Sequence, residues 1–138
     1  MGKIVSQYYF ATRSLAIFTA LHSLWYVLDP TSGKYVKIVP MYLADVFTPA
    51  FVAYWLMDDG YWENDGKTIY FCTECFTKLE CLFLIELLAQ LGIVATLKLR
   101  NKSKDTYRIR ISRLSLPLFR KLVMPYMHPV YLYKLGPV

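Results

Sequence analysis

Two adjacent carboxylates, Asp58 and Asp59, stand at the end of a strongly apolar segment. Thr48-Pro49 is a typical helix start, because Thr can accept a hydrogen bond from a free backbone N–H and Pro lacks the N–H that would be unpaired there. The sequence therefore predicts a helix from Pro49 to about Met57, ending at the two acids. Carboxylates at a helix C-terminus oppose its dipole, so folding alone does not favour them. We therefore expect these two acids to have a functional role.

A second group of residues that could do chemistry is basic. The segment from Lys98 to Arg113 holds a single acid, Asp105, and it accounts for the whole formal net charge of +6, because basic and acidic residues balance in the rest of the chain. Its basic members are Lys98, Arg100, Lys102, Lys104, Arg108, Arg110 and Arg113. A focused basic patch suits a polyanionic partner.

These basic residues follow the pattern of a hairpin, with strands at Ile93–Arg100 and Thr106–Ser112. Alternation places apolar side chains on one face and Lys, Arg, Thr and Ser on the other, with two Lys/Arg pairs opposed across the strands. Each like-charge pair costs about 0.2–1 kcal/mol, which favours a binding role. The alternative is an ordinary solvated face, but such a face mixes signs. A basic two-stranded ribbon also suits the major groove of DNA, where some side chains contact bases and others phosphates.

Other elements must position these groups. Thr77 and Glu80 form a capping box that predicts a helix to about Leu91, with Gly92 as its C-cap, and the apolar face of the hairpin is expected to pack on this helix. The remaining predicted elements are a strand at Ile4–Thr12, a helix at Arg13–Tyr26 with Ser14 as N-cap, a turn at Asp29–Gly33, an extended segment at Tyr35–Val39, a strand at Thr68–Thr73 and a helix at Leu116–Met124.

Composition limits the class of protein. The chain has 138 residues, of which 56% are hydrophobic, so it can bury one domain's core and is not disordered overall. Three cysteines, an odd number, favour a reducing compartment over a disulfide scaffold. No membrane span is expected, because the most apolar run, Cys81–Leu97, is interrupted by polar residues. The N-terminal composition also permits a transit peptide, although a strand is favoured there.

Two other constellations carry less weight. Cys72, Cys75, Cys81 and His128 could suggest zinc, but the chain has one Cys-x-x-Cys where structural zinc sites have two ligand pairs, so buried thiols are favoured. His22 and His128 have no neighbouring nucleophile of the triad kind, and the sequence has no Gly-rich phosphate loop.

Thr48-Pro49, the segment Val52–Gly60 and the Tyr-Lys-Leu at Tyr133–Leu135 together resemble the LAGLIDADG homing endonuclease family. The similar branch is the yeast mitochondrial two-motif type, whose second motif resembles LTPxxLAYWxMDDG. Tyr54 and Met57 depart from the literal family letters but fit this branch. The resemblance implies an α+β fold, an αββαββα half-saddle. It assigns residues 48–138 to one LAGLIDADG repeat with a basic β-saddle and residues 1–47 to the remnant, a strand plus a helix, of a preceding repeat.

The resemblance also implies an active site. In the family, two motif helices pack about a pseudo-twofold axis, and the last acid of each motif binds a divalent metal at the scissile phosphates. By resemblance Asp59 is this acid, with Asp58 either contributing through its backbone or serving as a cap or surface residue. Carboxylate oxygens suit Mg²⁺, which can stabilise attacking and leaving oxygens. Lys134 and Lys37 match the basic residue that each half places near the site; either could instead be solvated or contact phosphate.

The sequence contains one motif acid and matches the C-terminal portion of a two-motif enzyme. Mg²⁺-dependent cleavage of double-stranded DNA is therefore expected only with a partner that supplies the second motif, either a separate LAGLIDADG half or a second copy. Asp59 and Lys134 favour this hypothesis. The missing first motif favours an inactive derivative that binds structured RNA, as a maturase or a structural protein of an organellar ribonucleoprotein such as the mitochondrial ribosome. A fragment without function is a third alternative. The resemblance implies a mitochondrion or chloroplast, with no membrane partner.

Overall fold

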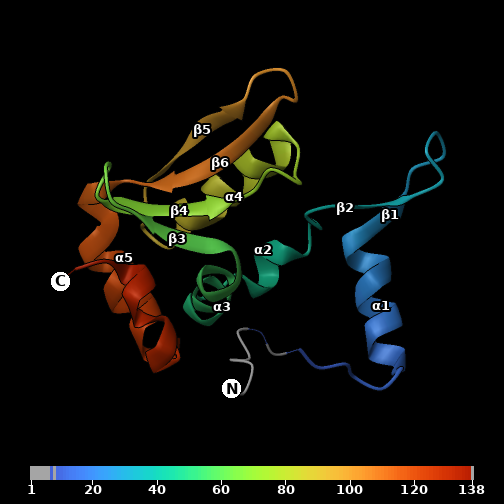
Figure 1. Cartoon of the computed structure of the whole chain (residues 1–138), viewed down its shortest axis with the longest axis horizontal. Coiled ribbons are helices and arrows are strands. Elements are labelled where there is room, and N and C mark those ends of the chain that lie inside the picture. Colours follow the sequence, from blue (N-terminus) through green and yellow to red (C-terminus); the bar gives the residue numbers. More distant parts are fainter. Residues whose placement is uncertain (1–6, 8, 138) are drawn as a thin grey trace, which may run out of the picture. The chain divides into compact units, whose positions relative to one another are not determined.

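The computed structural model describes residue 7 and residues 9–137, and the chain forms two compact units, Met1–Val36 and Lys37–Val138 (Figure 1). The predicted division into repeats at residues 1–47 and 48–138 stays a prediction. No helix in the described part of the chain is both long and apolar enough to span a bilayer.

The larger unit is built on a four-stranded antiparallel sheet with strand order β3-β4-β6-β5. Its strands are β3 (Gly60–Glu63), β4 (Thr68–Cys72), β5 (Ala95–Asn101) and β6 (Thr106–Ile111). Its main helices are α3 (Pro49–Asp59), α4 (Lys78–Gln90) and α5 (Leu116–Val123). From α3 to α5 the order is αββαββα, which confirms the predicted fold.

All three helices pack on one face of this sheet. Phe71 of β4 is fully buried there, stacked against Trp55 of α3 at 3.9 Å between ring centroids and edge-on to Phe119 of α5 at 6.3 Å. Helix α4 packs against β5 and β6, as predicted for the capped helix and the apolar face of the hairpin. Each large side chain buried here contributes about 1.5–3 kcal/mol. The opposite face of the sheet is left for polar side chains.

Local capping rules hold at both central helices. The Oγ1 atom of Thr48 accepts a hydrogen bond from the Phe51 N–H at 3.2 Å, and α3 continues through Asp59, slightly beyond its predicted end. At α4, Thr77 Oγ1 accepts from the Glu80 N–H, and the Glu80 carboxylate accepts from the Thr77 N–H at 2.7 Å. Helix α4 ends at Gln90, and Gly92, with φ +84°, supplies the left-handed conformation that follows many helices.

The smaller unit contains α1 (Ala16–Trp25) and a two-stranded ribbon of β1 (Tyr26–Leu28) and β2 (Tyr35–Lys37), which ends at the first residue of the larger unit. The predicted turn joins the two strands. The side-chain oxygens of Asp29 accept hydrogen bonds from Ser32 Oγ at 2.7 Å and the Thr31 N–H at 3.0 Å, which lower the pKa of this carboxyl. Gly33 adopts φ +69° in the same turn.

Two predictions for this unit were wrong. The N-cap of α1 is Leu15 rather than Ser14, and it makes no side-chain capping bond, so the helix is shorter than predicted. Residue 7 and residues 9–12 form no strand, while the rest of the predicted strand Ile4–Thr12 lies outside the described residues. Aromatic residues favour strands only where a neighbouring strand and a packed face are present, and these residues are exposed.

Candidate nucleic-acid interface and acidic helix end

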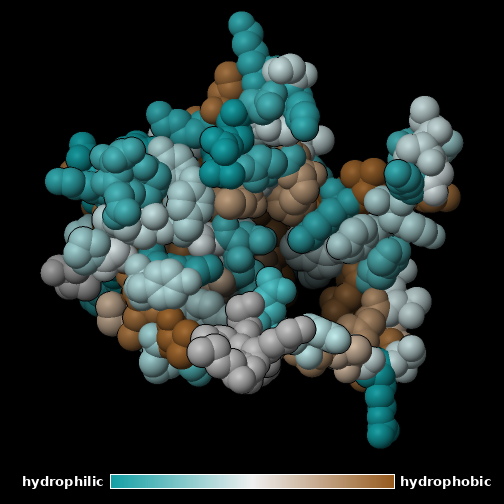
Figure 2. Space-filling model, viewed as in Figure 1, coloured by the Kyte–Doolittle hydropathy of each residue, from teal (hydrophilic) through white to brown (hydrophobic). Residues whose placement is uncertain are grey.

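The polar face of the sheet holds the predicted basic residues. Arg108 and Arg110 lie on β6 and are half-buried between the neighbouring strands, whereas Lys98 and Arg100 on β5 are exposed. The other predicted residues are also exposed: Lys102 and Lys104 in the β5–β6 loop and Arg113 at the start of the 3₁₀ helix η1 (Arg113–Ser115). Figure 2 shows hydrophilic side chains gathered over the β5–β6 end of the sheet.

The strand register corrects the predicted pairing of charges. Lys98 lies opposite Arg108, as one like-charge pair, but Arg110 lies opposite Thr96 on β5. An irregularity between Leu99 and Asn101 shifts the register toward the loop, so no second Lys/Arg pair forms. The cations are therefore spaced more widely across the face than simple alternation predicts, which lowers their mutual repulsion.

Arg108 differs from the other cations because Glu74, after β4, forms an ion pair with it. Its Nη1 also donates a hydrogen bond to the hydroxyl of Tyr61 on β3 at 2.8 Å. Partial burial acts to lower the pKa of Arg108, but the bonds to Glu74 and Tyr61 outweigh it and raise the pKa above its ordinary value. Arg108 is thus a fixed, permanently charged group. Glu74 and Tyr61 were not predicted from the sequence, since their contact with Arg108 depends on strands that are distant in the chain lying side by side.

The two motif carboxylates occupy the exposed end of α3. Asp58 and Asp59 are both exposed, and among the described residues no hydrogen bond or ion pair engages either side chain. Gly60 follows directly as the first residue of β3; a Cβ atom there would lie 2.9 Å from the Leu56 carbonyl oxygen. This turn therefore needs glycine for space, and it holds the acids at the edge of the sheet.

Lys134 is brought to the same helix end by the 3₁₀ segment η3 (Pro129–Leu135). Its half-buried ammonium donates hydrogen bonds to the carbonyl oxygens of Leu56, at 3.3 Å, and Met57. A cation is favoured at a helix C-terminus, where the dipole is negative. The structure thus brings Lys134 to the last turn of the helix that ends with Asp59.

Lys37, the other lysine predicted near the site, lies over the ring of Phe76. Its ammonium is 5.6 Å from the ring centroid of Phe76, in a cation–π contact. Cys75 is influenced by both Lys37 and Asp59: partial desolvation raises its pKa, the charge of Lys37 lowers it, and the charge of Asp59 raises it further. Among the described residues Lys37 forms no ion pair with Asp59.

The strand register shows that the acidic helix end and the basic face are neighbours: Gly60, which follows Asp59, lies opposite Phe71 of β4, and Arg108 lies opposite the next residue, Cys72. Burial is the main cause that raises the pKa of the Cys72 thiol; Arg108 and Arg100 lower it, while Glu74 and Asp59 raise it. The cations of the sheet and the motif acid thus act on one group at the end of the sheet. Such an arrangement can hold a phosphate backbone on the sheet with an acid beside it.

A sequence profile of the LAGLIDADG DNA endonuclease family matches residues 2–119. The chain belongs to this family. It is similar, at 33% identity over 98% of its length, to cytochrome b mRNA maturase bI2 of Saccharomyces cerevisiae, and at 27% over 98% to DNA endonuclease I-ChuI of Chlamydomonas applanata. It spans 32% of the length of the first relative and 64% of the second.

The LAGLIDADG fold is also found by structural comparison. The homing endonuclease I-WcaI bound to its DNA recognition sequence superposes with a TM-score of 0.63 at 34% identity. The match covers 72% of this chain and 46% of that chain. The antiparallel sheet and the helices packed on one of its faces are thus those of a LAGLIDADG protein.

LAGLIDADG endonucleases typically use a divalent metal, and the described residues were tested for a fit to one. No group of three or more His, Cys, Asp or Glu side chains in the described ranges is arranged to hold an ion. Asp59 offers exposed carboxylate oxygens, the ligand type that Mg²⁺ prefers, on a fixed helix end. The described residues therefore form no metal site by themselves, and Asp59 offers one carboxylate of the type that such a site uses.

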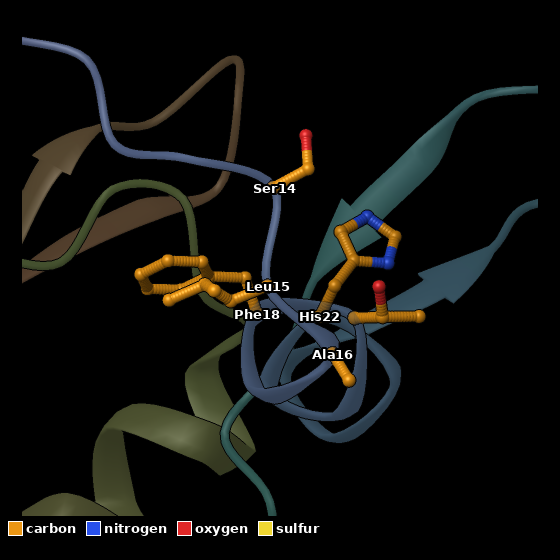
Figure 3. A pocket seen from close by; sticks show the side chains of 6 residues that line it. Ser14, Leu15, Ala16, Phe18 and His22 are labelled. Atoms are coloured by element: carbon orange, nitrogen blue, oxygen red, sulfur yellow. The ribbon is translucent and has the colours of Figure 1, made fainter.

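A hollow of about 520 Å³ lies on α1 of the LAGLIDADG chain (Figure 3). Phe18 and Leu15 lie on one side of it and His22 with Ser14 on the other. The His22 ring stacks on Tyr26 with centroids 4.7 Å apart and planes 5° from parallel. Among the described residues that line this hollow only His22 is titratable, so they form no acid–base pair.

Proposed function

We propose that this chain binds nucleic acid through the basic face of its sheet and takes part in Mg²⁺-dependent DNA strand cleavage when a partner supplies a second motif acid. The observation that carries the proposal is the position of Asp59. It is exposed, on a helix end that Lys134 contacts, and the residue after it, Gly60, lies opposite Phe71, next to the position where β4 pairs with Arg108 of the basic face.

The basic face supports the binding part. Among the described residues only Arg108 forms an ion pair, so the exposed cations on β5 and its loop are free to meet phosphates. Folding gains little from unneutralised cations. Phosphate contacts release counterions, and this makes binding strongly salt-dependent.

The outer side of α3 supports the need for a partner. Tyr54, about one turn before the acids, has 65% of its surface exposed. A groove of about 540 Å³ runs between this side of α3, including Met57 and Asp58, and the segment 125–131. We propose that this side packs against a second LAGLIDADG helix, either from a separate polypeptide or from a second copy, so that Asp59 meets its counterpart. In that complex Asp59 would hold Mg²⁺, which supplies charge stabilisation at the scissile phosphate, while Lys134, and in our proposal Lys37, orient the surroundings of the metal.

The cleavage test uses the full chain mixed with a complementing LAGLIDADG half and a DNA duplex in Mg²⁺. Asp59→Asn is expected to abolish cleavage and to leave duplex binding unchanged, because it removes charge from the acid without changing its size. Undiminished cleavage by this variant would remove Asp59 from the catalytic assignment.

The binding test uses Arg108→Ala with Arg110→Ala in one chain. Affinity should fall, and the slope of log affinity against log salt should flatten by up to about 2 on B-DNA, since each phosphate contact contributes about 0.9. A chain with Lys34→Ala and Lys121→Ala, which removes the same charge outside the sheet, is the control. Equal slopes in wild type and the arginine variant would exclude Arg108 and Arg110 from the phosphate contacts.

The second candidate is an RNA-binding maturase or a protein of an organellar ribonucleoprotein. The similarity to the cytochrome b mRNA maturase favours it, and RNA binding needs the basic sheet but not Asp59. In this case the wild-type chain and Asp59→Asn should bind structured intron RNA equally, and neither should cleave DNA with any LAGLIDADG partner. For both candidates we propose a mitochondrial or chloroplast location.

A further inference from the structure

The polar face of the sheet contains an aromatic pair that the proposed function does not use. Tyr61 of β3 lies opposite Tyr70 of β4, and their rings stack with centroids 5.7 Å apart and planes 22° from parallel. Both residues are half-buried, so part of each ring remains open to solvent. As a cross-strand pair they contribute to sheet stability, but that role alone does not require cations beside them.

Arg108 is held against this pair. Its guanidinium carbon lies 5.4 Å from the Tyr61 ring centroid, and its Nη1 bonds to the Tyr61 hydroxyl. Glu74 fixes the guanidinium from the other side. An arginine restrained by three contacts loses little conformational entropy when a ligand binds, so the group is ready to receive one.

A depression of about 280 Å³ opens between the tyrosines and the cations of β5. The tyrosine pair and Arg108 form one side, while Lys98 and Arg100 form the other. Lys98 and Arg100 are exposed and form no ion pair among the described residues. Glu63, whose carboxylate accepts hydrogen bonds from the Asp65 and Gly66 N–H groups, and Leu99 complete the lining. The depression thus joins flat π surfaces to an excess of positive charge.

This combination matches a nucleotide whose base is not paired. In a duplex the faces of the bases are stacked on one another, so a protein reaches only their edges and the phosphates. An unpaired base exposes its face, which stacks on tyrosine or arginine, while its phosphate is attracted to lysine and arginine. Tyrosines on a sheet with neighbouring cations form such a platform.

We propose that this depression binds an unpaired nucleotide of a structured nucleic acid, with its base against Tyr61 and Tyr70 and its phosphate at Lys98 and Arg100. The inference rests on the proposed function, since it requires nucleic acid on this face of the sheet. It goes further by naming the feature of the nucleic acid that the face recognises, a loop or bulge rather than continuous duplex. An RNA loop and a DNA loop share this chemistry.

The test measures affinity by fluorescence anisotropy for four probes at one salt concentration: an RNA hairpin with an unstructured loop, the DNA hairpin of the same sequence, and a fully paired duplex of each. A 2-aminopurine in the loop reports base stacking through quenching of its fluorescence. The main variant is Tyr61→Leu with Tyr70→Leu, which keeps apolar volume on the strands but removes the rings.

The leucine variant should bind both kinds of hairpin about 10-fold or more weaker, because stacking of one base contributes about 5- to 150-fold in affinity. Its affinity for the duplexes should stay within about twofold, and the 2-aminopurine quenching should disappear. Tyr61→Phe with Tyr70→Phe keeps the rings and should retain hairpin affinity and quenching. Tyr35→Leu, at an exposed tyrosine of the smaller unit, is the control and should have no effect. Stronger binding of the RNA hairpin than of the DNA hairpin would identify RNA as the source of the nucleotide.

Three results would overturn the inference. Equal losses for hairpins and duplexes would make the tyrosines part of a general backbone interface. Unchanged hairpin affinity in a leucine variant with native circular dichroism would remove the rings from the site. If the phenylalanine pair also lost hairpin affinity, the hydroxyls and not the rings would carry the effect. Failure of the proposed function looks different, because the wild-type chain would then bind none of the four probes.

Discussion

The ammonium of Lys134 donates a hydrogen bond to the main-chain carbonyl oxygen of Met57, two residues before the motif acid Asp59. A segment near the end of the sequence is thus attached to the last turn of α3, where the helix dipole is negative. The same cation also lies 5.5 Å from the ring of Tyr131. Lys134 therefore stabilises the helix end from which the acids project.

Replacing Lys134 by methionine should lower the free energy of unfolding by about 1–2 kcal/mol, because a half-buried cation at a helix C-terminus and its hydrogen bonds are lost while the volume is kept. Urea unfolding followed by circular dichroism measures the change. Lys104→Met, at an exposed lysine in the β5–β6 loop, is the control and should stay within about 0.5 kcal/mol of wild type. Equal free energies of unfolding for the two variants would mean that Lys134 does not stabilise the helix end.

Neutralising Asp59 should have the opposite effect on stability. Asp59→Asn removes a negative charge from the negative end of α3 and is expected to stabilise the fold by about 0.3–1 kcal/mol at low ionic strength. The gain should shrink as salt screens the charge. Glu86→Gln, within α4 and away from the helix ends, serves as the matched control in the same urea titrations. A loss of stability in Asp59→Asn would show that the carboxylate is structural.

Local sequence rules predicted the elements that local forces define. Thr48 and the Thr77–Glu80 box cap the helices as expected, and alternation assigned the two faces of the β5–β6 hairpin correctly. The short strand β3 was missed, because Tyr61 and Trp62 after a glycine have no distinctive period in four residues. Helix α2 (Leu43–Val46) and η3 were also not predicted, because neither segment shows a distinctive period.

The contacts that shape the candidate site depend on packing between distant residues. Arg108 meets Glu74, 34 residues away, and Lys134 meets Met57, 77 residues away. Neither hydrophobic periodicity nor a capping pattern indicates such pairs. The sequence therefore identified the basic residues and the acid, but not which of the cations is neutralised by an ion pair. The family resemblance pointed to Lys134 as a residue near the motif helix, which no local pattern of the sequence indicated.

Glu80 illustrates a local signal with a distant second role. One carboxylate oxygen completes the capping box with Thr77, and the other accepts a hydrogen bond from the Val39 N–H at 2.9 Å. Glu80→Ala should therefore destabilise the chain by about 2–3 kcal/mol, against about 1 kcal/mol for Thr77→Ala, which loses the cap alone. Urea midpoints at constant slope measure both. Equal costs for the two variants would show that the bond to Val39 adds no stability.

The three thiols should react slowly with alkylating reagents near neutral pH. Burial is the first cause that raises the pKa of Cys72, Cys75 and Cys81 above the ordinary value of 9.0. At pH 8 fewer than about one thiol in ten is then the reactive thiolate. Iodoacetamide labelling followed by mass spectrometry should modify the exposed Cys75 first and the buried Cys81 last, with rates rising about tenfold per pH unit up to pH 9. Rapid labelling of Cys81 at pH 7 would contradict its burial.

The same raised pKa of Cys81 makes folding stability depend on alkaline pH. Above pH 9.0, the ordinary value, the unfolded chain loses the Cys81 proton while the folded chain keeps it. The folded state then binds more protons, so stability falls as pH rises, whereas below this range the contribution is fully present. Urea unfolding at pH 8 and pH 10 should show a loss that is smaller in Cys81→Ala, which has no proton to release there. An identical loss in both chains would assign the alkaline destabilisation to other groups.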